Sequence, residues 1–105
     1  MTDAAADRVE RLVALLGLAR NAGKLAVGVS AVEEMVRKGR RPLLVVATDA
    51  GAGLRARAQR WQPVRRVLAD AVSGADLARA LGRDKLSVVG VCDPGFVQGI
   101  EKIGF

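Results

Sequence analysis

The sequence has no histidine and no tyrosine, and it contains a single cysteine, Cys92, among 105 residues. Without histidine, the usual general base and a common zinc ligand are both missing. One cysteine cannot form an internal disulfide, nor can a four-ligand zinc site be assembled around it. We therefore expect no metal, no cofactor and no Ser/His/Asp or Cys/His catalytic arrangement, and we expect that the chain is not an enzyme.

Aromatic side chains are scarce, since Trp61, Phe96 and Phe105 are the only three. Modules that read single-stranded RNA stack bases on aromatic rings, and one tryptophan cannot make such a platform. Long apolar runs are also missing, because none approaches the ~20 residues that span a bilayer. The first eight residues lack the basic and apolar regions of a secretion signal. These absences predict a cytoplasmic protein without a membrane partner.

Basic residues, by contrast, are plentiful. Seventeen Lys and Arg residues against eleven Asp and Glu residues give a formal charge of +6. Such a surplus in a short chain favours a polyanionic partner, and nucleic acid is the first candidate. Arg20 and Lys24 flank one glycine turn and Arg83 and Lys85 follow another, so that backbone N–H groups can join them in binding phosphates. We expect a structured RNA, recognised by shape, backbone and a few base edges, and no small-molecule substrate.

The spacing of hydrophobic residues predicts alternating helices and short strands. Helices are expected over residues 7–22, 30–38, 52–61, 73–81 and from 93 onward. Apolar, β-rich runs predict strands at 24–27, 43–47, 64–68 and 86–92. This alternation predicts one α/β domain over residues 1–105. We expect a three-layer α/β/α sandwich with a central sheet of about four strands, mixed or largely parallel.

Local signals also predict the ends of the helices. Ser30 begins an S-x-x-E capping box with Glu33, so Ser30 is predicted as the N-cap of the second helix. Asp49 is expected to cap the basic helix that follows it, and Ser73 and Asp93 are expected to cap the two later helices. Cys92 ends a valine-rich strand and is therefore expected to be a small, inward-facing and inert residue.

One motif suggests a different function. Residues 51–56 read Gly-Ala-Gly-Leu-Arg-Ala, a match to the G-x-G-x-x-A fingerprint of dinucleotide-binding folds, and Asp70 follows about 20 residues on. However, three residues separate the strand from Gly51, and Asp49 would place a carboxylate where the pyrophosphate should bind. Nucleotide binding is therefore the third hypothesis. RNA binding comes first, and a protein-interaction module that assembles on a ribonucleoprotein comes second.

Several strings in the chain resemble a known family. Strings at residues 15–25 with Gly28, at 43–47 with Asp49, and at 80–83, 88–91 and 93–96 resemble the bacterial YlxQ-type proteins. Those proteins belong to the kink-turn-binding superfamily of ribosomal proteins L-seven-Ae and L-thirty-e, and the resemblance covers nearly the whole chain. It implies an α/β/α fold and non-catalytic binding of a kink-turn or related internal loop in ribosomal or regulatory RNA.

The resemblance also implies where RNA would bind. The superfamily uses the turn into the second helix, with the pattern G-x-N-E-x-x-K, and an apolar-containing loop before the last strand. Carried over, these sites fall on residues 28–34 and 83–87, where Gly28 matches the pattern but Ser30, Ala31 and Glu34 replace its Asn, Glu and Lys. The candidate RNA-binding residues are Arg20, Lys24, Gly28, Val29, Ser30, Ala31, Glu34, Arg83, Asp84, Lys85, Leu86 and Ser87.

Overall fold

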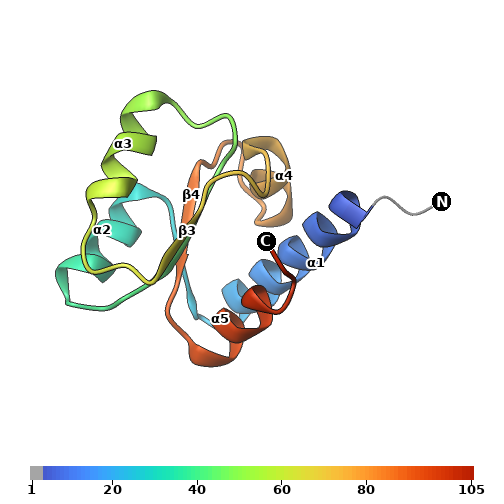
Figure 1. Cartoon of the computed structure of the whole chain (residues 1–105), viewed down its shortest axis with the longest axis horizontal. Coiled ribbons are helices and arrows are strands. Elements are labelled where there is room, and N and C mark those ends of the chain that lie inside the picture. Colours follow the sequence, from blue (N-terminus) through green and yellow to red (C-terminus); the bar gives the residue numbers. More distant parts are fainter. Residues whose placement is uncertain (1–3) are drawn as a thin grey trace.

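The computed structural model describes residues 4–105; residues 1–3, which belong to the stretch considered for a secretion signal, lie outside it. In the described part, helices alternate with short strands (Figure 1). None of these helices is long and apolar enough to cross a membrane. In chain order the elements are α1 (Ala4–Asn21), β1 (Leu25–Val27), α2 (Val29–Arg37), β2 (Leu43–Val46), α3 (Ala52–Arg60), β3 (Arg66–Leu68), α4 (Gly74–Ala80), β4 (Val88–Val91) and α5 (Pro94–Glu101).

The four strands form one mixed sheet in the order β1-β4-β2-β3. β4 is antiparallel to both of its neighbours, whereas β2 and β3 are parallel. Val27 of β1 lies opposite Val89 of β4, and Leu43 of β2 lies opposite both Val91 and Arg66. The start of β2 therefore lies at the same end of the sheet as the end of β4 and the start of β3. The other end holds Val27, Val46 and Val88.

Helices cover both faces of this sheet, so that β2 and β4 are buried along their whole length. Leu43 and Val45 face the side covered by α1, α4 and α5, while Leu44 and Val46 face the side covered by α2 and α3 (Figure 1). Because successive side chains of a strand alternate between faces, each central strand contributes to both hydrophobic clusters. The predicted three-layer α/β/α sandwich with a four-stranded mixed sheet is confirmed.

Two of the predicted helix caps are confirmed. Ser73 accepts a hydrogen bond from the amide of Asp76 at 3.1 Å, and Asp93 accepts one from the amide of Phe96 at 3.2 Å. Each bond satisfies one amide that the first turn of a helix leaves without an intrahelical acceptor. The starts of α4 and α5 are therefore fixed by side chains that the sequence identified.

The prediction that Ser30 is an N-cap is wrong. The cap of α2 is Gly28, at φ 90° and ψ 168°, no side chain caps this helix, and Ser30 lies in its first turn. The Gly28 amide donates to the carbonyl of Val88 at 2.9 Å, while the amide of Val32 donates to the Gly28 carbonyl at 3.1 Å. Pairing with β4 therefore decides where α2 begins, and it overrides the local capping-box spacing.

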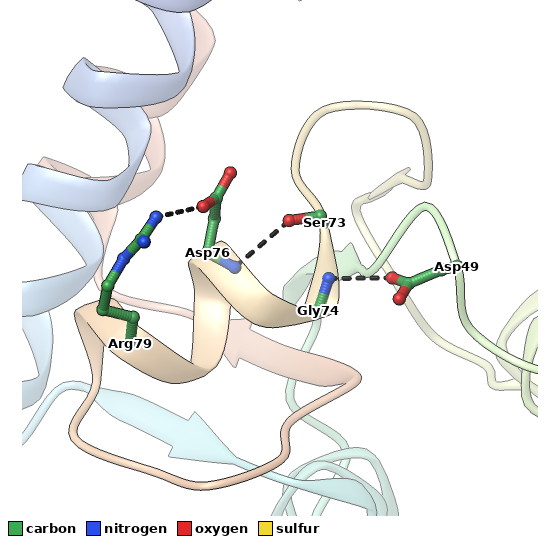
Figure 2. A network of polar contacts seen from close by, with 5 residues as sticks. All are labelled: Asp49, Ser73, Gly74, Asp76 and Arg79. Atoms are coloured by element: carbon green, nitrogen blue, oxygen red, sulfur yellow. Dashed lines mark hydrogen bonds and ion pairs between the residues drawn. The ribbon is translucent and has the colours of Figure 1, made fainter.

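Asp49 does not cap α3, whose cap is Gly51 without a side-chain bond. Its carboxylate instead accepts a hydrogen bond at 2.8 Å from the amide of Gly74, the first residue of α4. Figure 2 shows Asp49 reaching the amide of Gly74 from a separate loop, while Ser73 binds the amide of Asp76, whose carboxylate pairs with Arg79. The prediction for Asp49 is thus corrected, because the carboxylate reaches a helix 25 residues away.

Candidate nucleic-acid interface

The two segments proposed to bind RNA meet at one end of the sheet. The hydrogen bond from the Gly28 amide to the Val88 carbonyl joins the turn before α2 to the start of β4. The amide of Ala47 donates to the carbonyl of Ser87 at 2.8 Å, which fixes the same loop to the end of β2. Residues 83–87 therefore end beside Gly28, so that two segments distant in the sequence are adjacent at this point.

The first turn of α2 presents hydrogen-bond donors on this surface. Within residues 4–105, the amides of Val29, Ser30 and Ala31 have no acceptor, and no side chain caps the helix. Ser30 and Ala31 are exposed, while Val29 is half-buried. A methyl group added at Gly28 would meet no atom within 4 Å, so the approach to these amides is open. The positive end of the helix dipole therefore faces solvent where an anion or a base edge can bind.

Cationic side chains line the adjoining loop. Arg83, Asp84 and Lys85 are exposed, and neither Arg83 nor Lys85 forms an ion pair within the described residues. The guanidinium of Arg20 reaches within 3.9 Å of the position that a Cβ of Gly82 would occupy. The side chain of Arg20 thus extends from α1 to the turn that precedes this loop. Three cations and one carboxylate give the loop a positive field that attracts phosphates.

The carboxylates of α2 are matched by basic residues. Glu34 lies 2.9 Å from the guanidinium of Arg37 and 3.7 Å from the ammonium of Lys38, and Glu33 lies 3.5 Å from the guanidinium of Arg57. Exposed pairs of this kind contribute little to stability, but they cancel most of the local charge. Glu34 stands where the G-x-N-E-x-x-K pattern has Lys. Arg37 and Lys38 offset the repulsion that its carboxylate would exert on a phosphate.

Two predicted RNA-binding residues are placed elsewhere. Lys24 precedes β1 and Gly28 follows it, so four steps of extended chain separate them by about 13 Å and place Lys24 at the opposite end of the sheet. Leu86 is only 6% exposed and packs in the cluster under α1, α4 and α5, so its side chain is not presented to a ligand. Ser87 is half-buried, and its carbonyl is used by Ala47.

One further basic residue, Arg55, lies at this end of the sheet. Arg55 of α3 donates to the backbone carbonyl of Thr48 at 2.8 Å and lies 3.5 Å from the carboxylate of Asp70. Its guanidinium is therefore held beside the end of β2, next to the Ser87 anchor, rather than free in solvent. No local pattern marks this role, because Thr48 takes part only through its carbonyl oxygen.

The first glycine of the fingerprint does not make the turn that dinucleotide binding requires. Gly51 has φ −61° and ψ 154°, an extended conformation that any residue adopts. In dinucleotide-binding folds, by contrast, the first glycine makes a tight turn between strand and helix. Here Gly51 is simply the N-cap of α3, and Asp70 is paired with Arg55.

Two proteins of known structure are similar to this chain in fold. A protein of unknown function from Bacillus halodurans matches with a TM-score of 0.72 and 28% sequence identity, over 89% of this chain and 95% of that one. A 15.5 kD RNA-binding protein from Giardia lamblia matches with a TM-score of 0.63 and 15% identity, over 98% of this chain and 87% of that one. This chain shares their fold. No protein-family model matches the sequence, and no curated protein matches it.

Proposed function

We propose that this chain binds structured RNA, without catalysis, through the surface on which the first turn of α2 meets the loop of residues 83–87. The observation behind the proposal is the Gly28–Val88 hydrogen bond, since it places three free amides beside a basic loop. The fold shared with the Giardia lamblia RNA-binding protein supports an RNA partner, as does the formal charge of +6.

The donors on this surface favour an RNA internal loop over a regular duplex. A-form RNA presents mainly phosphates and 2′-hydroxyls in a shallow groove, whereas an internal loop exposes base edges. The amides of Val29, Ser30 and Ala31 are donors at a fixed helix end, and such donors can bind an acceptor on an exposed base. The cations of the loop would hold the flanking phosphates. A kink-turn or related internal loop in ribosomal or regulatory RNA has both features, which agrees with the resemblance to the kink-turn-binding superfamily.

Equilibrium binding across a salt series tests this proposal. The probes are a synthetic RNA with an asymmetric internal loop between two duplex arms and a plain duplex of equal length. We expect tighter binding to the first RNA, and we expect the three cations of the loop to contribute roughly 2–3 to the log–log salt slope, because each phosphate contact contributes about 0.7–0.9. Equal affinity for both RNAs would contradict internal-loop recognition. Binding to neither RNA would contradict RNA binding altogether and favour the protein-interaction hypothesis.

A further inference from the structure

The opposite end of the sheet carries a second basic region. Arg41 precedes β2 and Arg65 precedes β3, and these strands are parallel and adjacent, so both arginines lie at the same end. The amide of Arg65 donates to the carbonyl of Pro42 at 2.8 Å, which ties the two segments together. Lys24, which precedes β1, also lies at this end. The start of α5, which follows the end of β4, lies there as well (Figure 1).

A cleft of about 370 Å³ opens between these arginines and α5. The residues that line it include Arg41, Arg65, Cys92, Gln98 and Glu101. Glu101 lies 3.1 Å from the guanidinium of Arg65, so its charge is already matched. The side chains of Arg41 and Gln98 are exposed, which leaves the cleft open to large ligands.

The charge in and beside the cleft is positive. Arg40 and Arg41 are exposed and have no carboxylate partner within the described residues, while Arg65 is matched by Glu101. Arg40 precedes Arg41 in the chain, and its guanidinium lies close to Cys92, one of the residues that line the cleft. Guanidinium groups bind phosphate oxygens in a bidentate fashion and are weakly hydrated, and both properties suit a phosphodiester backbone.

We propose that this cleft, lined by Arg41, Arg65 and Gln98 with Arg40 at its rim, binds the phosphate backbone of a second stretch of the same RNA. The choice of RNA as partner rests on the proposed function. β4, with four residues, spans about 13 Å, so the cleft lies about that far from the Gly28 end. One bent RNA can therefore contact both ends of the sheet, its internal loop at α2 and one of its arms at the cleft.

Site-directed hydroxyl-radical cleavage tests the second contact. Cys92→Ala removes the natural thiol, and Gln98→Cys or Asp84→Cys then provides one attachment point for an iron chelate at the cleft or at the α2 surface. A third variant, Glu10→Cys on the exposed side of α1, measures background cleavage. The probe is the synthetic RNA with an asymmetric internal loop. We expect cuts at the internal loop from position 84, and separate cuts in one duplex arm from position 98.

The outcomes separate the two proposals. Cleavage from position 84, with position 98 no more active than position 10, would overturn the second contact and leave the proposed function standing. Cleavage from neither position 84 nor position 98 would overturn the proposed function.

A second measurement retains Cys92 and therefore does not depend on how Cys92→Ala folds. The double variant Arg40→Ala/Arg41→Ala should reduce the salt slope by about two on the same RNA. The matched variant Arg8→Ala/Arg60→Ala removes two exposed charges elsewhere and should leave the slope unchanged. Equal slopes for the two double variants would overturn the second contact.

Discussion

The amide nitrogen of Gly28 lies 2.9 Å from the carbonyl oxygen of Val88, and this hydrogen bond determines how α2 begins. It satisfies the amide of Gly28, the N-cap residue, which adopts φ 90° and ψ 168°. The next three amides are then left facing solvent, beside the loop that leads into β4. The bond therefore fixes where α2 begins, and the amides that follow are free because the first turn of a helix offers them no acceptor.

The conformation of Gly28 predicts a strong requirement for glycine. Its φ and ψ lie in a region that only glycine adopts readily, so Gly28→Ala should lower the free energy of unfolding by about 1–3 kcal/mol. Gly17→Ala is the matched control, because Gly17 lies inside α1 with open space around its Cβ position, and it should stabilise the protein by about 0.5–1 kcal/mol. Urea denaturation measures both. Equal effects of the two substitutions would contradict the conformation described for Gly28.

Ser30 offers a test of binding that is separate from stability. Its side chain makes no capping bond, so Ser30→Ala should change the free energy of unfolding by less than about 0.5 kcal/mol, rather than by the ~1 kcal/mol that loss of a cap costs. If the exposed hydroxyl hydrogen-bonds RNA, affinity should fall roughly fivefold, which corresponds to about 1 kcal/mol. We expect this fivefold loss in a titration with the internal-loop RNA. Unchanged affinity would remove Ser30 from the interface.

Arg83 and Lys85 should act through charge alone. Because both side chains are exposed, Arg83→Ala/Lys85→Ala should leave the thermal midpoint nearly unchanged. The salt slope for RNA binding should fall by about two, with a similar loss of affinity for the internal-loop RNA and the plain duplex. Arg8→Ala/Arg60→Ala removes the same charge elsewhere and serves as the control. A slope that stays at the wild-type value would place the phosphate contacts on other residues.

Asp49 should stabilise α4 rather than α3. Asp49→Ala removes the acceptor of the Gly74 amide and should cost about 1 kcal/mol of stability. Asp70→Ala removes another carboxylate, which is 92% exposed, and should cost less than about 0.5 kcal/mol. Hydrogen exchange at the Gly74 amide should accelerate in the first variant and stay unchanged in the second. Acceleration at the first amides of α3 instead would show that Asp49 caps α3, as the sequence suggested.

Burial raises the pKa of the Cys92 thiol above its ordinary value of 9.0, and Arg40 beside it partly offsets this rise. The sulfur also lies 3.3 Å from the sulfur of Met35. Iodoacetamide should therefore label the folded protein at pH 8 more slowly than the chain unfolded in urea. Because folding favours the neutral thiol, its contribution to stability is present below pH 9 and decreases as the pH rises above that value. Cys92→Ala should remove this contribution to the pH dependence of stability. Equal rates of labelling in the folded and the unfolded protein would contradict the burial of the thiol.

The sequence predicted features that depend on local chemistry. The periodicity of α1, the apolar run of β2 and the caps Ser73 and Asp93 involve residues close in the chain, and the structure confirms them. Cys92 is half-buried rather than fully buried, because the cleft beside α5 exposes part of it.

The features that local patterns do not predict depend on contacts between distant segments. Ser30 has the spacing of a capping box, but the bond between Gly28 and Val88 begins the helix two residues earlier. Asp49 precedes α3 in the chain, but its carboxylate accepts a hydrogen bond from the first amide of α4, because β2 ends beside the start of that helix. Lys24 and Gly28 were both predicted to bind RNA, but the extended strand β1 lies between them and keeps them apart.

The most direct test of the proposed interface is the change in amide chemical shifts when the internal-loop RNA is added to ¹⁵N-labelled protein. The proposed interface predicts the largest shifts at Val29, Ser30 and Ala31 and along residues 83–87, with smaller shifts at these amides on addition of the plain duplex. Shifts that avoid both segments, or that are equal for the two RNAs, would contradict the claim that this surface recognises structured RNA.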